Sequence, residues 1–258
     1  ADDILEQDAM ARLLEAARVH NADIAGGVFR RHVGNSSFIV DAFAHDDYSM
    51  NFRNDKAKAE RYCTNFSSCN KIFRAELFRN PDFRFTQGLY MQDIEFWLKA
   101  MFSCSKVTQV QHVVSNYRFF NDSGSRLRSK ARFDSLFALF EGLETHFGMD
   151  DYQPFRVFGH YAIMQGALPF FAKWKLEHWK LSGDQADLDR MRELLLKIPE
   201  SNIASFCRMK RSISNAHALL LIRDGNYRDA CRIGELATAP AMNSPLIQRA
   251  IREPAVAR

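Results

Sequence analysis

Three short stretches in the first half of the sequence carry residue types that suit chemistry. Asp2 and Asp3 stand side by side just before a predicted helix. Adjacent carboxylates suit a hard divalent cation, which takes oxygen ligands and often takes substrate phosphates as well. Asp93 follows a glycine turn in the aromatic-rich stretch 88–97, and an aspartate at the start of such a helix suits general base catalysis. Residues 68–78 add a lysine and an arginine at a predicted strand-to-helix junction.

Each stretch, taken alone, also has a structural interpretation. Acidic residues before a helix or in its first turn commonly cap it and offset the positive end of its dipole, which accounts for Asp2, Asp3 and Asp93 without any chemistry. Residues 68–78 then need be no more than a capped turn. For each stretch by itself, both interpretations stay open.

The elements that position these residues follow from the hydrophobic periodicity. The expected elements of the first half are a helix over 5–20, a strand over 22–29, a short strand near 38–43, a helix near 56–62, an extended segment over 65–73, a short helix over 74–79, a helix over 90–103 and one or two strands over 106–114. Within the strand over 22–29, the pair Gly26 and Gly27 indicates a backbone packed closely against a neighbour.

The character of the sequence changes after residues 121–125, whose Asn-Asp-Ser-Gly-Ser composition is typical of a linker. Almost no strand pattern follows. Apolar residues instead recur at helical spacing, beginning with a phenylalanine-rich stripe from Phe133 to Phe147. The sequence therefore predicts an α/β region over 1–125 followed by an all-α region over 126–258.

Composition and charge exclude several classes of function. A net charge of +4 over 258 residues falls short of the basic stripe typical of nucleic-acid binding, so no nucleic-acid partner is expected. The five cysteines form no CxxC pair, which indicates neither a zinc site nor a disulfide framework and fits reduced thiols in the cytoplasm. No uncharged apolar run reaches about 18 residues, so no membrane-spanning helix is expected. The GxSxG and P-loop motifs of hydrolases and kinases are absent.

The order and spacing of the stretches resemble bacterial family-2 glycosyltransferases of the GT-A fold. Residues 1–10 match the end of the family's Asp-x-Asp-Asp motif and the helix after it, and 21–27 match its Ala-Asp-Ile segment. Residues 69–74 match a Cys-Asn-Lys-hydrophobic-Phe-Arg segment, and 92–97 match an acidic pair that opens a helix with Phe and Trp. A Tyr-Arg strand end followed by Asn and Ser matches 116–125. The five loose motifs occur in the family's order.

This resemblance implies a partial GT-A-type mixed sheet with helices, followed by the all-α region. It implies an inverting, metal-dependent transfer of a sugar from a nucleotide-sugar donor to a glycan or lipid-linked acceptor. Asp93 would act as the general base that takes the proton of the acceptor hydroxyl. Asp2 would hold a divalent metal, Mn²⁺ or Mg²⁺, that neutralises the departing nucleotide diphosphate. The residues implied in substrate binding are Asp3, Tyr90, Gln92, Trp97 and Arg118.

Departures from the family pattern change what is expected. Gln92 replaces the glutamate of the family's Glu-Asp pair, whereas Asp93 is kept. The family's first motif aspartate and its nucleotide-binding βαβ units have no counterpart. We therefore expect 1–125 to be the acceptor-side half of a GT-A domain, 126–258 a helical C-terminal extension, and the chain an N-terminally truncated fragment that is inactive by itself. The Gln-x-x-Arg-Trp signature of processive members is absent, which favours transfer of single sugars.

The resemblance places the parent enzyme in bacterial polysaccharide biosynthesis, in the cytoplasm or at the inner face of the membrane. Two alternatives stay open. In the first, the helical region is a non-catalytic protein-interaction module and the front half is a remnant. In the second, the chain is a peripheral membrane adaptor that contacts anionic lipid through Arg208, Lys210 and Arg211, a cluster that also fits an ordinary solvated helix face.

Overall fold

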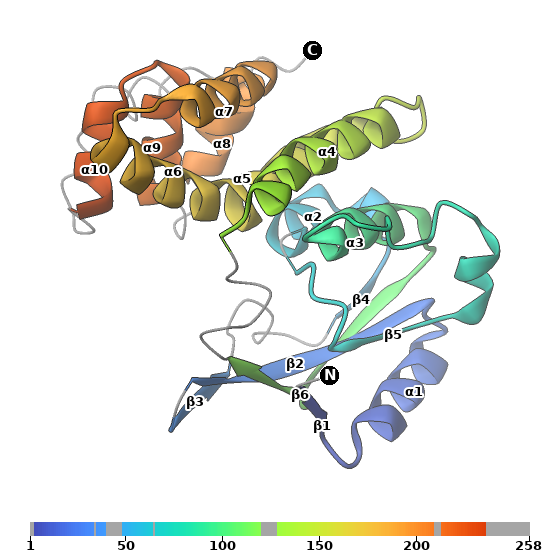
Figure 1. Cartoon of the computed structure of the whole chain (residues 1–258). Coiled ribbons are helices and arrows are strands. Elements are labelled where there is room, and N and C mark those ends of the chain that lie inside the picture. Colours follow the sequence, from blue (N-terminus) through green and yellow to red (C-terminus); the bar gives the residue numbers. More distant parts are fainter. Residues whose placement is uncertain are drawn as a thin grey trace. The chain divides into compact units, whose positions relative to one another are not determined.

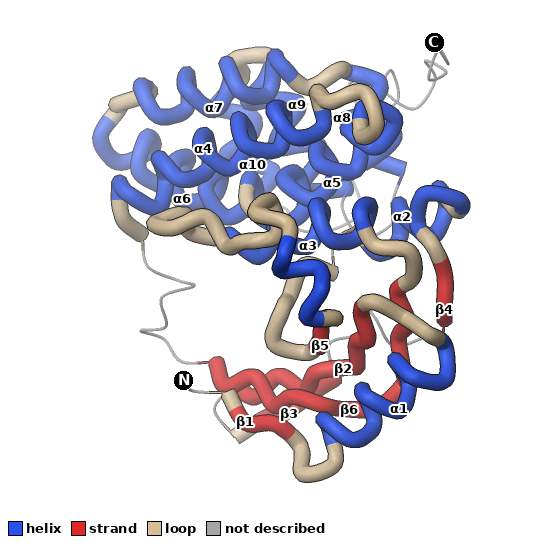
Figure 2. Tube along the Cα trace, turned by 90° about the vertical axis from the view of Figure 1, so that its right-hand side faces the viewer, coloured by secondary structure: helices blue, strands red, loops and turns tan. Residues whose placement is uncertain are grey.

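The computed structural model divides the chain into two compact units, Ala1–Phe158 and Gly159–Arg258, which are described separately (Figures 1 and 2). The residues that the structure describes are 3–33, 35–39, 48–63, 65–119, 128–208 and 213–235. The predicted metal ligand Asp2 lies outside them.

The first unit combines a sheet with helices. Its strands are β1 (Ile4–Leu5), β2 (Ile24–Val33), β3 (Ser36–Ile39), β4 (Tyr48–Met50), β5 (Lys71–Phe73) and β6 (Val107–Phe119). Its helices are α1 (Ala9–His20), α2 (Lys56–Tyr62), α3 (Gln92–Ser103), α4 (Lys130–Phe147) and the start of α5 (Arg156–Gly166), with 3₁₀ turns at Phe52–Asn54, Ala75–Arg79 and Gln153–Phe155.

The six strands form one mixed sheet around a parallel pair. β2 and β6 pair in parallel from Ile24 opposite Val107 to Val33 opposite Phe119. β3 and β5 join β2 in antiparallel fashion, and β1 and β4 join β6 in the same way. A mixed sheet with helices, followed by helices alone in the rest of the described chain, confirms the predicted fold class.

The helix expected over 5–20 begins later, at Ala9, because the residues before it extend as β1. Ile4 pairs with Asn116 of β6, and Leu5 pairs with Ser115. The β6 strand correspondingly continues to Phe119, beyond the predicted end at residue 114. A long-range strand pairing thus sets both boundaries, whereas periodicity reports only local pattern.

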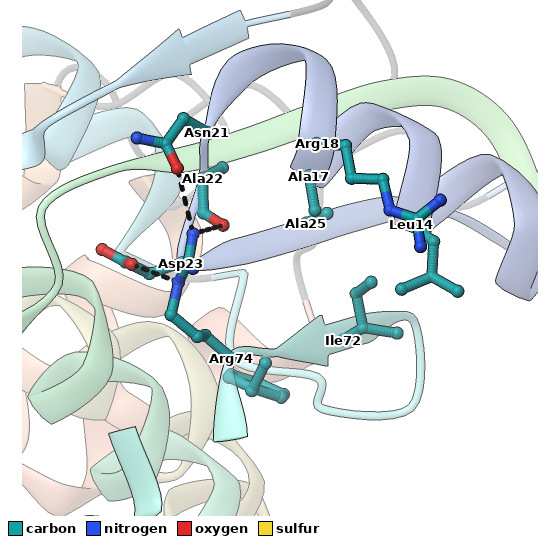
Figure 3. A pocket seen from close by; sticks show the side chains of 10 residues that line it. Leu14, Ala17, Arg18, Asn21, Ala22, Asp23, Ala25, Ile72 and Arg74 are labelled. Atoms are coloured by element: carbon teal, nitrogen blue, oxygen red, sulfur yellow. Dashed lines mark hydrogen bonds and ion pairs between the residues drawn. The ribbon is translucent and has the colours of Figure 1, made fainter. Parts of the chain in front are cut away.

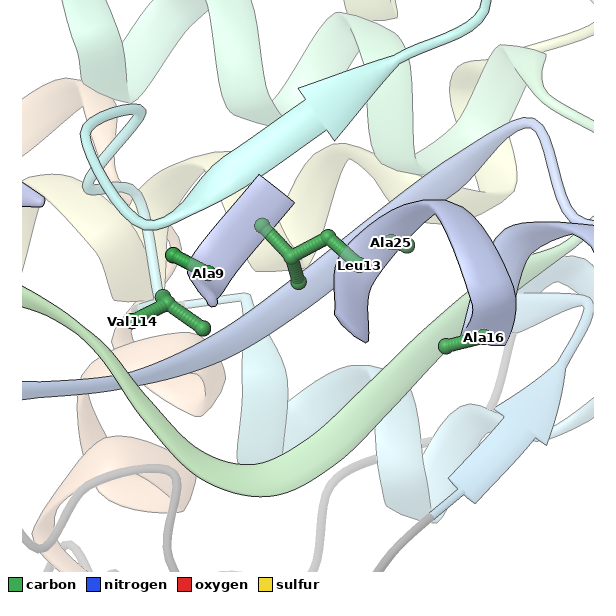
Figure 4. Close-up of a cluster of buried hydrophobic side chains, with 5 residues drawn as sticks. All are labelled: Ala9, Leu13, Ala16, Ala25 and Val114. Carbon is green, nitrogen blue, oxygen red and sulfur yellow. The ribbon is translucent and has the colours of Figure 1, made fainter. Parts of the chain in front are cut away.

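Helix α1 covers one face of the sheet through small side chains that allow close approach. Figure 4 shows the buried cluster between them: Ala9, Leu13, Ala16, Ala25 and Val114. A Cβ atom at Gly27 would lie 2.5 Å from Cγ1 of Val114 and 2.9 Å from the carbonyl oxygen of His112. The backbone of β2 therefore has room for glycine alone at this position, as the Gly26–Gly27 pair predicts.

Helices α2 and α3 lie on the other side of the sheet (Figure 1). The inward side chains of α3 are at most 1% exposed: Ile94, Trp97, Leu98 and Met101. At the end of α3, Phe102 stacks on Phe155 with ring centroids 4.5 Å apart and on Phe158 at 5.4 Å. Helix α4 also packs against α3. The first helix after the predicted linker therefore belongs to the first compact unit.

The second unit is built from helices throughout its described residues. They are the remainder of α5, α6 (Leu168–Ser182), α7 (Ala186–Lys197), α8 (Glu200–Arg208), α9 (Ile213–Arg223) and α10 (Tyr227–Glu235). Helix α9 packs against α7, α8 and α10, and α10 also packs against α6. Lys175 donates to Asp187 at 2.5 Å, and the Tyr227 hydroxyl donates to Asp189 at 2.5 Å.

Two predictions about the second half stay untested. The boundary between 125 and 126 lies within 120–127, outside the described residues, while the compact units divide inside α5. The side chains of Arg208, Lys210 and Arg211 also lie outside the described part of the structure. Within the described part, no helix is both long enough and apolar enough to cross a membrane.

The Asp23 carboxylate joins the starts of β2 and β6 to the end of β5. It accepts the N–H of Ser105 at 2.7 Å, its hydroxyl at 2.5 Å and the N–H of Lys106 at 3.3 Å. The Nε atom of Arg74, just after β5, donates to it at 2.8 Å. Burial alone would raise the pKa of Asp23, but these hydrogen bonds outweigh burial and lower it.

We expect Asp23→Asn to lower the free energy of unfolding by about 2 kcal/mol, because an amide leaves at least one of these donors without an acceptor. Urea unfolding followed by circular dichroism measures the loss. Asp8→Asn, at a half-exposed aspartate paired with Arg12 and His112, is the matched control and should lose far less. Equal losses of unfolding free energy in the two variants would show that the Asp23 contacts stabilise the fold no more than the Asp8 contacts do.

His146 of α4 is a buried imidazole in the first unit. His146 is 5% exposed, and its Nε2 atom has no hydrogen-bond partner among the described residues. The centroid of its ring lies 4.3 Å from the centroid of the Tyr152 ring. Burial, together with the charge of Lys99, lowers the pKa of His146 to about 4. The folded protein therefore holds this imidazole neutral.

Stability should fall as the pH drops from about 7 towards 4, because the unfolded chain takes up a proton on His146 that the folded chain refuses. By about pH 5 the loss should reach roughly 2 kcal/mol. Other carboxylates also titrate in this range, so the measurement is the difference in urea stability between the wild type and His146→Gln at each pH. A constant difference across the range would contradict the prediction.

Candidate functional site

A strained turn delivers Asp93 to the start of α3. Gly88 and Met91 both have left-handed backbone conformations, with φ of 76° and 61°. For a methionine this conformation is costly, and such strain concentrates at functional sites. Asp93 follows in the first turn of the helix and is half-buried. Burial raises the pKa of Asp93, opposed by the N–H groups of Asp93 and Ile94 and by the charge of Lys71.

The second acidic residue of this turn, Glu95, is engaged in packing. It is 6% exposed, accepts the Thr86 hydroxyl at 2.7 Å and forms an ion pair with Lys99 at 2.6 Å. A Cβ at Gly142 of α4 would lie 3.3 Å from the Glu95 carboxylate, so α4 covers it closely. Glu95 therefore joins α3 to its neighbours.

Lys71 of β5 is a buried lysine held by the loop that precedes its strand. Its Nζ donates to the backbone carbonyl of Asn65 at 3.0 Å and to the Asn65 side-chain oxygen at 2.8 Å. It also donates to the carbonyl of Ser67 at 2.5 Å and to the side-chain oxygen of Asn70 at 3.0 Å. The same Nζ lies 4.6 Å from the ring centroid of Trp97 on α3. Burial lowers the pKa of Lys71 to about 7.

The neighbours of Lys71 explain why the Cys-Asn-Lys segment and the Gly26–Gly27 pair accompany each other. The Asn70 side chain donates to the carbonyl of Gly27 at 2.5 Å, and Gly26 pairs with Lys71 across the sheet. A Cβ at Gly26 would lie 2.5 Å from Oε1 of Gln109 and 3.3 Å from Cγ of Lys71. The small residues of β2 thus make room for the lysine beside them.

A group of aromatic and basic side chains adjoins the turn before α3. Tyr90 is 37% exposed, and its N–H donates to the hydroxyl of Ser135 on α4 at 3.3 Å. The Arg132 guanidinium lies 6.0 Å from the Tyr90 ring, and that of Arg31 lies 5.7 Å from the Tyr117 ring. Burial lowers the pKa of Arg132, and the neighbouring Tyr90 and Tyr117 act in the opposite direction. The sequence indicated Tyr90 as a substrate contact, but neither of these two arginines.

The other predicted site residues lie in different settings. Trp97 is 1% exposed and its indole N–H donates to the carbonyl of Tyr62 at 3.2 Å, so its ring lies in the core beneath Lys71 rather than on a solvent-facing wall. Gln92 is half-buried and opens α3. Arg118 is exposed on β6, and its backbone N–H donates to Asp3 at 3.2 Å. The structure thus joins Asp3 to Arg118, and Tyr90 and Gln92 to Asp93 through one turn.

A polar cluster on the strands was missed from the sequence. Asn116 of β6 donates to Glu6 at 2.9 Å and contacts His32 of β2 at 2.9 Å, and Arg30 lies 3.4 Å from both Glu6 and Asn116. Arg30 and His32 alternate along β2 opposite Asn116 and Arg118. Residues two apart on a strand point to the same face, so the spacing of Arg30 and His32 is a signal that the sequence contains. The pairing of β2 with β6 is needed to recognise that these residues face Asn116.

The described residues do not by themselves make a metal site. They contain no group of three histidine, cysteine, aspartate or glutamate side chains that could hold an ion. Asp3 contributes one carboxylate, which accepts the N–H of Arg118. Asp2 lies outside the described residues, so the predicted metal ligand is untested.

A pocket of about 380 Å³ lies between α1 and β5 (Figure 3). Leu14, Ala17 and Ile72 contribute apolar walls, and the Arg74–Asp23 ion pair lies at one side. Ile72 follows Lys71 on β5, so the two side chains point to opposite faces of the sheet. This pocket therefore lies on the α1 face, away from the Lys71 side chain, and none of the predicted site residues lines it.

Comparison with solved structures places this architecture. The crystal structure of S. aureus TarS residues 1–349 in complex with UDP-GlcNAc superposes with a TM-score of 0.63 at 13% identity, covering 92% of this chain and 65% of that one. The complex of the same protein with UDP gives 0.60 at 13% identity, covering 93% and 66%. The chain has a glycosyltransferase-like fold.

The likeness has defined limits. A longer S. aureus TarS structure gives a TM-score of 0.57 at 12% identity and is covered over 38% of its length, against 90% of this chain. The chain thus spans about two thirds of the shorter TarS chains and less of the longer one. No family model matches the sequence, and no curated protein matches it. At this identity the likeness shows the fold alone.

Proposed function

We propose that the chain is part of an inverting, family-2-like glycosyltransferase that moves a sugar from a nucleotide-sugar donor to a glycan or lipid-linked acceptor. The observation that carries the proposal is the position of Asp93, half-buried at the start of α3 within a glycosyltransferase-like fold. The two TarS complexes hold UDP-GlcNAc and UDP, which supports a uridine-type nucleotide sugar as the donor class.

In this proposal Asp93 takes the proton from the acceptor hydroxyl as that oxygen attacks the anomeric carbon. The direction of its pKa suits the role, because a carboxylate whose pKa is raised is a stronger base when it is ionised. The N–H groups of Asp93 and Ile94 act on the carboxylate from the first turn of α3.

The donor diphosphate needs positive charge, and the basic side chains beside the turn can supply it. Arg132 lies over the ring of Tyr90, in the turn that leads to Asp93, and Arg31 lies over the ring of Tyr117. Guanidinium groups match phosphate oxygens well. Arg118, Asp3, Tyr90 and Gln92 remain proposed substrate contacts, and Trp97 supports the site from beneath.

A divalent metal, Mn²⁺ or Mg²⁺, remains part of the proposal, with Asp2 as its ligand. Such an ion would neutralise charge that develops on the departing diphosphate. We further propose that residues 1–125 form the acceptor-side half of the catalytic domain and 126–258 a helical extension. The proposed setting is bacterial polysaccharide biosynthesis in the cytoplasm or at the inner membrane face.

Replacement of the base tests this function. In the protein as its gene encodes it, Asp93→Asn should lower the rate of UDP release from UDP-GlcNAc by at least about 100-fold, because the amide cannot accept the proton. Calorimetric affinity for UDP in the presence of Mn²⁺ should stay unchanged. Asp82→Asn, an exposed aspartate before the same turn, is the matched control and should keep its rate.

Two results would contradict the proposal. Retained transfer by Asp93→Asn would remove Asp93 as the base. Absence of binding to any nucleotide or nucleotide sugar, by the protein as encoded, would remove the transferase function and leave the interaction-module alternative.

The pH dependence gives a further expected outcome. Because burial raises the pKa of Asp93, the rate should fall on the acid side with a midpoint above the ordinary aspartate value of 3.8. Steady-state rates measured at saturating donor report this midpoint. An acid limb that persists unchanged in Asp93→Glu and in Asp93→Asn would assign the titration to another group.

A further inference from the structure

We propose that Lys71 is a positioning residue for Asp93: its buried ammonium, clamped by the loop before β5 and lying on Trp97, stabilises the Asp93 carboxylate in its proton-accepting form. This inference rests on the proposed function of Asp93 as the base. It assigns a role to the lysine of the Cys-Asn-Lys segment, which the sequence explained only as part of a capped turn.

Helix geometry places the Lys71 ammonium against α3, at the ring of Trp97 one turn after Asp93. Asp93 and Trp97 are four residues apart on α3 and therefore lie next to each other on its surface. Since the Nζ of Lys71 lies 4.6 Å from the Trp97 ring centroid, it approaches α3 one turn beyond Asp93. The charges of Asp93 and Lys71 act on each other in both directions.

The loop fixes the ammonium from the opposite side. Asn65, Ser67 and Asn70 all accept hydrogen bonds from the same Nζ, and Asn70 is itself tied to the carbonyl of Gly27 on β2. Lys71 is 9% exposed, and Asn65 and Asn70 are 0% exposed. The ammonium therefore cannot swing into solvent without breaking several buried hydrogen bonds, and its distance to α3 is set by the sheet.

The charge of Lys71 is costly to bury. Burying an ammonium costs several kcal/mol, and its hydrogen bonds offset part of that cost. The loop oxygens that accept from Lys71 Nζ belong to backbone carbonyls and side-chain amides, which carry no formal charge. Asp93 supplies a negative charge on α3, and this charge attracts the buried ammonium of Lys71.

The groups that face the pair define its pH behaviour. The pKa of Lys71 is lowered to about 7, because burial outweighs the opposing charges of Cys69 on the loop and Asp93 on α3. On α3, Glu95 pairs with Lys99, so these two charges largely offset each other. Below about pH 7 Lys71 carries its charge and supports the ionised Asp93, and above that pH the support fades.

Nuclear magnetic resonance of the wild-type protein tests the coupling without any substrate. The side-chain carboxyl carbon of Asp93, assigned by its absence in Asp93→Asn, should show two inflections with pH. The first belongs to Asp93 itself, and the second should coincide with the pH at which the Lys71 side-chain nitrogen loses its proton. The second inflection should survive in Cys69→Ser, which removes the neighbouring thiol.

Two lysine variants sharpen the test. Lys71→Met should abolish the second inflection and raise the pKa of Asp93, because the supporting charge is gone. Lys71→Arg keeps a permanent charge, so it should abolish the second inflection but leave the pKa of Asp93 near its wild-type value. Lys99→Met, a lysine of α3 paired with Glu95, is the matched control and should leave both inflections in place.

Transferase assays read the same role through the rate. Lys71→Met should lower kcat by about 10- to 100-fold with little change in KM for UDP-GlcNAc, and Lys71→Arg should restore most of the rate.

A single Asp93 inflection in the wild-type protein would overturn the proposal, and so would an unchanged Asp93 titration in a folded Lys71→Met. Because the wild-type titration does not depend on Lys71→Met, misfolding of that variant cannot leave the question undecided. The coupling and the proposed function fail separately: two inflections with no transferase activity would reject the function alone, and one inflection with an inactive Asp93→Asn would reject the coupling alone.

Discussion

The first unit depends on one carboxylate that holds three strands in register. Asp23 ends the turn after α1, and its oxygens accept donors from the residues before β6 and from the arginine that follows β5. The parallel pairing of β2 with β6 and the antiparallel pairing of β2 with β5 start at the very next residue, Ile24. Every side chain proposed for chemistry on β5 and β6 is therefore placed relative to this anchor.

The two faces of the sheet differ in character: one packs against apolar side chains of α1, and the other carries polar side chains. On one face, alanines of α1 lie against Ala25 and Val114, where close packing leaves room for few polar groups. On the other face, glycine at position 26 opens space for Lys71 and Gln109, and α3 brings Asp93 above them. A single strand with two adjacent glycines thus serves as packing surface on one side and as the floor of a polar site on the other.

Local pattern predicted much of this arrangement. Helix α2 occupies its predicted range, and α3 begins two residues after its predicted start. Both helices could be predicted because their apolar residues recur at helical spacing within one element. The position of Asp93 in the first turn of α3 follows from the same periodicity. The glycine pair predicted close packing because few other roles require two glycines inside a strand.

What local pattern could not supply came from contacts between distant segments. The predicted helix over 5–20 loses its first residues, because Ile4 and Leu5 form β1 instead. These two residues pair with β6, more than a hundred residues away in the sequence. The burial of Trp97 and the clamp on Lys71 depend on a loop that the sequence describes only as extended. Arg31 and Arg132 meet the two tyrosines from different elements, so no spacing in the sequence connects them.

The long parallel ladder between β2 and β6 has a consequence for how the chain acquires its structure. The strands at 24–33 and 107–119 are separated by many tens of residues. The loop between them must close before the hydrogen bonds that join the two strands can form. Such non-local topology slows folding, and during synthesis β2 has no parallel partner until β6 has left the ribosome. Until then β2 has β3 and β5 as its sheet neighbours among the described strands, and the ribosome-bound chain exposes a strand edge that favours association with other chains.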